Sequence, residues 1–153
     1  MEKTKIDGLA GLQALLGKEL APGAWHTLTF EDITRFADAT GDHQWIHVDR
    51  ERIARESPFG APIAHGFYTL SRTAALFLDA VEISGFSGVI NYGLNKVRFP
   101  APLKEGATYR LVPMLAEVNE VKGGVEAVFR MTVEIQGSDK PALVAESVFR
   151  FFA

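Results

Sequence analysis

Two residues in one short stretch of the sequence have side chains suited to acid–base chemistry. Asp42 supplies a carboxylate, and His47 supplies an imidazole five positions further along the chain. If both point at one bound molecule, such a pair can take a proton from water and deliver it elsewhere. The spacing equally permits a structural role, in which Asp42 caps backbone amides and His47 bonds a local carbonyl. On these residues alone, both interpretations stay open.

A helix is predicted immediately before this stretch. Thr29 is a good N-cap, because its hydroxyl can accept from free N–H groups of the first turn. The carboxylates of Glu31 and Asp32 favour the positive end of the helix dipole, so the helix is expected to begin near Phe30. Gly41 can adopt the left-handed conformation that commonly ends helices.

A second, shorter helix is predicted after the pair. Asp49 is a good cap for a helix over residues 50–56. That helix is expected to end before Pro58, because a proline disfavours helical conformation in the residue that precedes it. Residues 42–48 are therefore predicted to form a loop that is held at both ends.

Residues 36–47 resemble the signature of the MaoC-like, (R)-specific enoyl-CoA hydratases of the hydratase 2 type. That motif runs small residue, Gly, Asp, any residue, Asn, Pro, aliphatic residue, His, and the resemblance implies that Asp42 and His47 are the catalytic pair. Gln44 and Trp45 stand where the family usually has Asn and Pro, as in a subgroup related to nodulation protein N. Both are candidates for substrate contact, and Trp45 is a candidate either for lining an acyl channel or for the core.

The resemblance suggests further substrate-binding residues. The family's His-Gly step, which opens its central helix, falls on His65-Gly66, so the Gly66 N–H is expected to bind the thioester carbonyl. The alternatives are a Gly66 needed only for close packing and a His65 that is a structural neighbour. Lys96 and Arg98 share one face of a predicted strand and are candidates either for the phosphates of coenzyme A or for an ordinary solvated face.

Composition places the chain among ordinary globular proteins. With 153 residues, of which 47% are hydrophobic and 23% charged, it is predicted to form one domain over residues 1–153. A net charge of −3 gives no electrostatic case for nucleic acid or an anionic membrane. The absence of cysteine excludes disulfides and thiolate sites, and the spacing of the four histidines predicts no metal site. Lacking a signal peptide or a membrane-length apolar run, the protein is expected in the cytoplasm.

Hydrophobic periodicity predicts an α+β fold. Residues from about 66 to 82 are apolar nearly all round a helix, which is typical of a buried one. Alternating and strand-forming segments follow, with a hairpin turn at 121–124. The predicted strands cover residues 24–28, 89–99, 108–121, 125–136 and 142–152, and Asp7 is expected to cap a helix over residues 8–16. This layout agrees with the single hotdog fold that the resemblance implies, a long antiparallel sheet wrapped around a central helix.

The resemblance implies hydration of an acyl thioester. Water would add to a trans-2-enoyl-CoA to give the (3R)-hydroxyacyl-CoA, with coenzyme A as part of the substrate and no separate cofactor. Asp42 is assigned as the base toward water, and His47 as the partner that manages the proton delivered to the α-carbon. Two alternatives remain: a hotdog acyl-CoA thioesterase, for which Asp79 is the only acid on the central helix, and a non-catalytic acyl-binding protein.

A homodimer is also predicted. A single hotdog unit leaves one sheet edge with unpaired N–H and C=O groups, which proteins normally pair, cover or blunt. Pairing through a two-fold axis lets the same edge serve both subunits. The resemblance implies that two active sites form at that interface.

Overall fold

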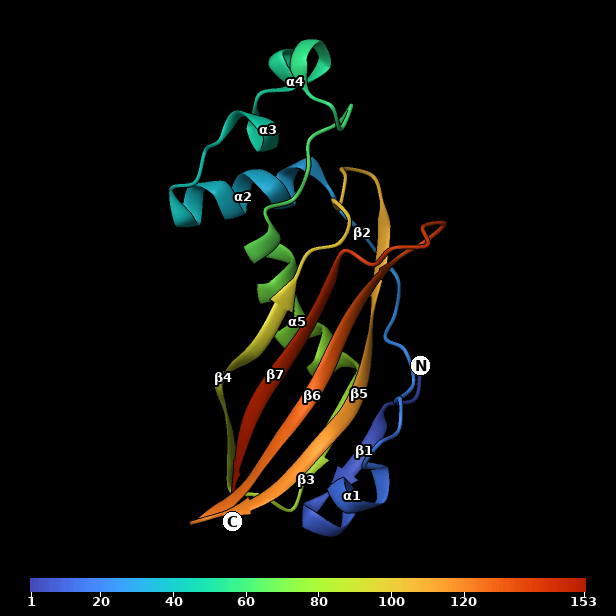
Figure 1. Ribbon diagram of the computed structural model, residues 1–153, viewed down its shortest axis with the longest axis vertical. Coiled ribbons are helices and arrows are strands. Elements are labelled where there is room, and N and C mark those ends of the chain that lie inside the picture. Colours follow the sequence, from blue (N-terminus) through green and yellow to red (C-terminus); the bar gives the residue numbers. More distant parts are fainter.

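A curled antiparallel sheet wraps around one long helix in the computed structural model, which describes residues 1–153 (Figure 1). The five strands lie in the order β2-β5-β6-β7-β4. Their bounds are β2 His26–Thr27, β4 Gly88–Arg98, β5 Thr108–Val121, β6 Gly124–Ile135 and β7 Leu143–Phe152. Helix α5, Gly66–Ala80, packs against β5, β6 and β7. The predicted α+β layout is therefore present.

The core lies between α5 and the concave face of the sheet. The predicted alternation along β6 is confirmed, because five of the six side chains predicted to face inward are buried, and Ile135 at the end of the strand is half-buried. The five are Val125, Ala127, Phe129, Met131 and Val133. Phe77 of α5 meets the sheet there, with ring centroids 4.8 Å from Phe129 and 5.4 Å from Phe149. Burying a side chain of this size stabilises the fold by about 1.5–3 kcal/mol. These aromatic contacts anchor the helix along the sheet.

The N-terminal part differs from the prediction. A parallel pair of short strands, β1 Thr4–Asp7 and β3 Val81–Ser84, joins segments that are far apart in the sequence and that carry no alternation long enough to reveal them. The predicted strand 24–28 shrinks to β2, because only His26 and Thr27 pair with β5. Asp7 precedes α1, Gly8–Leu15, without capping it, since its Oδ1 accepts from Ser84 Oγ at 2.9 Å.

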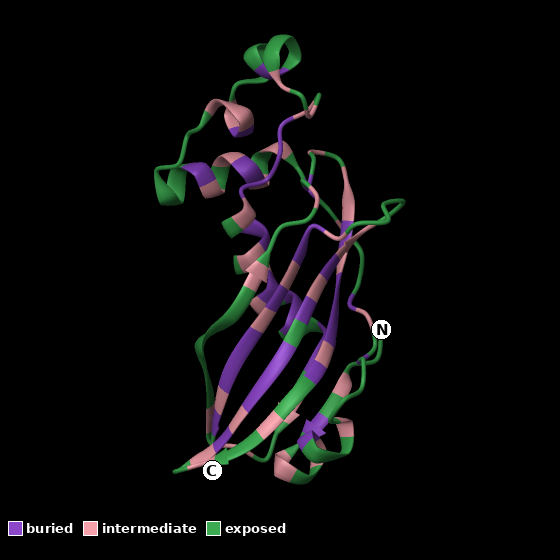
Figure 2. Ribbon diagram, viewed as in Figure 1, coloured by how far each residue is buried: buried purple, intermediate pink, exposed green.

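Helix α5 is not buried all round, contrary to the expectation. One stripe faces outward and includes Phe67, 69% exposed, and Leu78, 56% exposed. Next to it, edge strand β4 pairs with β7 on one side only and is mostly exposed (Figure 2). Its exposed apolar side chains include Ile90 and Tyr92. In a single chain the sheet therefore covers only part of the helix. Neither α5 nor any other helix is long and apolar enough to cross a membrane.

Helix α2, Phe30–Thr40, has the predicted bounds and carries the turn that holds Asp42. Thr29 Oγ1 accepts from the Asp32 N–H at 3.1 Å, and the Thr29 N–H donates to Asp32 Oδ2 at 3.0 Å. This reciprocal pair is a capping box. Gly41 ends the helix with φ of 79°, a left-handed value that glycine adopts without strain.

The cap of α4, Arg50–Glu56, also agrees with the prediction. Asp49 Oδ1 accepts from the Arg52 N–H at 3.0 Å. Figure 1 shows α2 and α4 at one end of the molecule, with the four-residue helix α3, Trp45–Val48, between them. The opposite end carries α1, β1 and β3. The predicted loop at residues 42–48 is thus only partly a loop.

The capping box yields a stability prediction. Replacing Thr29 with alanine removes the hydroxyl that accepts from Asp32, so we expect the free energy of unfolding to fall by about 1 kcal/mol. Urea denaturation measures this change. The control is Thr34→Ala within the same helix, expected to change stability by about 0.5 kcal/mol or less. Equal effects of the two substitutions would contradict the role of the cap.

Candidate functional site

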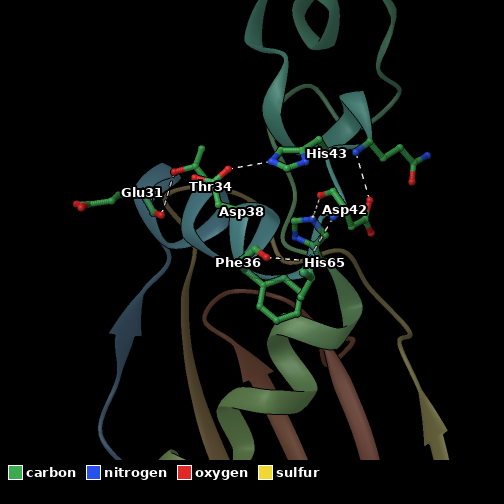
Figure 3. Close-up of polar contacts among 9 residues, drawn as sticks. Glu31, Thr34, Phe36, Asp38, Asp42, His43 and His65 are labelled. Carbon is green, nitrogen blue, oxygen red and sulfur yellow. Dashed lines mark hydrogen bonds and ion pairs between the residues drawn. The ribbon is translucent and has the colours of Figure 1, made fainter.

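Three chain segments meet where α2, α3 and α5 converge. They bring together Asp42 from the turn after α2, His47 from α3 and His65 from the residue before α5. The functional atoms of these three side chains all lie within 4.8 Å of one another. Figure 3 shows His65 at the start of α5, next to the turn that carries Asp42. The residues predicted as a catalytic pair are thus close enough to hold one water molecule between them.

Asp42 presents its carboxylate at the exposed edge of this cluster. Its Oδ1 accepts from the Gln44 N–H at 3.2 Å, which is the local amide contact expected of a structural aspartate. Its backbone carbonyl accepts from His65 Nε2 at 2.9 Å. No protein group hydrogen-bonds Oδ2. The structural role is therefore real, and it leaves one carboxylate oxygen available for a ligand.

His47 is buried, with 6% of its surface exposed. Its Nδ1 lies 2.6 Å from the Ile63 carbonyl oxygen, and since a carbonyl only accepts, Nδ1 carries the proton and Nε2 is left as an acceptor. Burial lowers the pKa of His47 below its ordinary value of 6.5, and the charge of neighbouring His65 acts in the same direction. The Ile63 carbonyl and Asp42 oppose this shift. His47 is therefore neutral at neutral pH.

His65 lies flat against His47. The two ring centroids are 3.7 Å apart and the ring planes differ by 20°. Phe36 of α2 packs against the same ring at 5.0 Å. From the sequence, His65 is expected to be a structural neighbour, and the only local signal for its place in the cluster is the His-Gly step at the start of α5.

Two histidines and a carboxylate are also a common set of metal ligands. A metal ion must lie about 2.0–2.1 Å from each nitrogen, along a lone pair in the plane of each ring. The rings of His47 and His65 are stacked nearly parallel, so their lone pairs run side by side and do not converge on one point. This geometry favours proton transfer over metal binding.

A cavity of about 280 Å³ adjoins His47 and the start of α5. Most of its lining is apolar and includes Phe59, Ile63, Phe99, Pro102 and Leu103, with His47, Gly66 and Thr69 also on its wall. A side chain at position 66 would lie 3.0 Å from the Phe99 ring, which explains why a glycine fits there. The Gly66 N–H is the first of α5 and has no acceptor within the helix. Close packing and a free N–H donor therefore coexist at this residue.

The other predicted substrate residues lie apart from the cavity. Gln44 is exposed, and the half-buried Trp45 carries the Arg52 guanidinium over its ring at 4.2 Å. Lys96 and Arg98 line a separate hollow of about 340 Å³, together with Arg130, Val144 and Glu146. Within one chain these two cations do not meet Asp42 and His47, and a substrate role for all four residues stays a prediction.

Comparison with known proteins agrees with this geometry. A family profile described as MaoC like domain matches residues 12–137. The 3-hydroxyacyl-thioester dehydratase Z of Mycobacterium tuberculosis is 48% identical over 149 residues, which cover 97% of this chain and 98% of that protein. Nodulation protein N of Rhizobium leguminosarum bv. viciae is 43% identical over 145 residues, which cover 90% of this chain and 86% of that protein.

The fold is shared with solved structures. An unliganded R-hydratase from Pseudomonas aeruginosa superposes with a TM-score of 0.72 over 89% of this chain and 81% of that chain, at 21% identity. At that identity the likeness concerns the fold alone, and it agrees with the hotdog arrangement of sheet and helix. The family profile and the two relatives together establish that this chain belongs to the MaoC-like dehydratases, hydro-lyases built on the hotdog fold.

Proposed function

We propose that this protein catalyses the reversible hydration of a trans-2-enoyl-CoA to the (3R)-hydroxyacyl-CoA. The observation that carries the proposal is the meeting of the Asp42 carboxylate with a neutral His47 beside an apolar cavity. A relative named 3-hydroxyacyl-thioester dehydratase supports a thioester substrate of this class. No group besides the substrate is needed, because the thioester itself accepts the electrons.

Asp42 and His47 can act on one water molecule from two sides. The water donates one hydrogen to Asp42 Oδ2 and the other to His47 Nε2, which leaves an oxygen lone pair to attack carbon 3 of the substrate. As the new C–O bond forms, the electrons of the double bond move toward the thioester oxygen. Asp42 takes the proton from the water, and the pair delivers a proton to the α-carbon, so no proton is gained or lost overall.

The Gly66 N–H is assigned to the thioester oxygen in this scheme. Negative charge develops on that oxygen while water attacks, and a fixed N–H donor stabilises the transition state more than the ground state. Loss of one such donor typically costs about 2.7–4 kcal/mol. Gly66 and His47 both line the cavity, which supports their action on one bound ligand.

The thioesterase alternative finds no comparable support. Asp79, the only acid on α5, lies 13 positions after Gly66. With a rise of about 1.5 Å per residue, the two are roughly 20 Å apart along the helix.

An assay with crotonyl-CoA tests the proposal directly. Loss of the enoyl absorbance without release of free thiol indicates hydration. Release of thiol would indicate hydrolysis, and no change with any enoyl-CoA chain length would favour a binding protein.

Substitution of the pair gives the sharpest kinetic prediction. Asp42→Asn removes the base and His47→Gln removes the imidazole acceptor, and we expect each to lower kcat for hydration by ~10²–10⁴-fold. Circular dichroism and the melting temperature check that the fold persists. His43→Gln is the matched control, because His43 is exposed and its Nε2 pairs with Asp38 at 2.8 Å. Near-full activity of either variant would remove that residue from the mechanism.

The lowered pKa of His47 predicts the shape of the pH profile. His47 accepts from water only when neutral, so activity is present above its pKa and is lost as the pH falls through it. Because burial lowers that pKa, the acid limb of kcat/KM assigned to His47 is expected below pH 6.5. The limb should be missing from the residual activity of His47→Gln. A limb above pH 6.5 that disappears in this variant would contradict the assignment.

We also propose that the active form is a homodimer. Edge strand β4 has no partner on its outer side, and the exposed stripe of α5 adjoins it. A second copy placed on this surface would cover Phe67 and Leu78 and pair the free edge. In such a dimer the phosphates of a bound coenzyme would have the cations Lys96 and Arg98 of the neighbouring protomer within reach.

The dimer is tested by sedimentation at low micromolar concentration. We expect about twice the 16.8 kDa mass of one chain. Leu78→Glu places a charge in the proposed interface and should shift the protein to monomer with loss of activity. Leu16→Glu, at an exposed residue beside β5 and not β4, serves as the control and should remain dimeric. A wild-type monomer that hydrates enoyl-CoA would refute the proposal.

A further inference from the structure

We propose that His65 is a positioning residue that aligns both members of the Asp42–His47 pair. The inference rests on the proposed function for its kinetic consequence. His65 contacts the two residues in different ways, through a hydrogen bond to one and through a stacked ring to the other. No other side chain in the structure is bonded to one of them and stacked on the other.

The first contact fixes the turn that carries Asp42. His65 Nε2 donates to the Asp42 carbonyl oxygen at 2.9 Å, across 23 positions of sequence. The other bonds of this turn are local, since the Asp42 N–H reaches Thr40 Oγ1 at 3.4 Å, the Gly41 N–H donates to Ala37 and the Gln44 N–H donates to Asp42 Oδ1. The exposed turn is therefore tied to the rigid start of α5 chiefly by His65, and with it the direction in which the Asp42 carboxylate projects.

The second contact fixes the plane of the His47 ring. The Ile63 carbonyl holds His47 Nδ1 but leaves the ring free to tilt about that bond. The flat face of His65 at 3.7 Å removes this freedom, and Phe36 packs against His65 in turn. The lone pair of His47 Nε2 thereby keeps one direction, which is a condition for holding water in a reactive position.

The two contacts of His65 can be removed one at a time by substitution, because its second ring nitrogen, Nδ1, makes no hydrogen bond. Nδ1 is buried and has no hydrogen-bond partner, so a carbon atom in its place sacrifices no bond. His65→Phe therefore keeps a flat ring against His47 and loses only the bond to Asp42. His65→Gln has the opposite effect, because its amide can still donate to the Asp42 carbonyl while the stacked ring is gone.

Histidine NMR titration and steady-state kinetics test the proposal in both variants. We expect kcat to fall about tenfold in each, the factor that corresponds to one hydrogen bond in His65→Phe and to one aromatic contact in His65→Gln, with KM within about twofold of the wild type. The pKa of His47 should rise in both, because the charge of His65 helps to lower it. His26→Gln is the matched control, since His26 lies against Tyr109 with ring centroids 6.0 Å apart and outside the cluster.

Two outcomes overturn the inference. One is wild-type kcat together with an unchanged His47 titration in a variant that folds. The other is a lowered melting temperature with no change in either readout, which would make His65 purely structural. The titration reads the contact between His65 and His47 without turnover, so a failure of the wild-type protein to hydrate enoyl-CoA is distinguished from a failure of this inference. If one variant does not fold, the other still tests its own contact.

Discussion

The packing of α5 against the concave face of the sheet is the constraint on which the site depends. Phe77 and its aromatic partners on β6 and β7 hold the helix along the sheet, and this fixes where its first residue lies. Gly66 and His65 lie at that point, so their positions depend on the packing of the helix behind them. Close packing of this kind transmits position over the length of a helix, since a protein interior has little room for adjustment.

The site combines buried side chains with one that is exposed to solvent. His47 and His65 are buried, whereas Asp42 is exposed in the single chain. Burial keeps His47 neutral, and exposure leaves the Asp42 carboxylate open to water, so each residue occupies the environment that suits its assigned role.

The same packing explains why α5 has an uncovered stripe. Five strands, of which β2 has only two residues, curl far enough to enclose one side of the helix. The helix sequence is apolar on nearly every face, which suits a helix enclosed on all sides more than one at a surface. The apolar composition of α5 and the unpaired edge of β4 are the two observations behind the proposed homodimer.

Local signals in the sequence determined much of this protein. The caps of α2 and α4, the alternation along β6 and the spacing of Asp42 and His47 each depend on residues a few positions apart, and the structure has them as predicted. Tertiary structure alone decided the rest. The pairing of Thr4 with Val81, the contact of His65 with Asp42 and the separation of Lys96 from the proposed catalytic pair all depend on how distant segments pack. No local pattern encodes such contacts, because they form only when the chain folds α5 against the sheet.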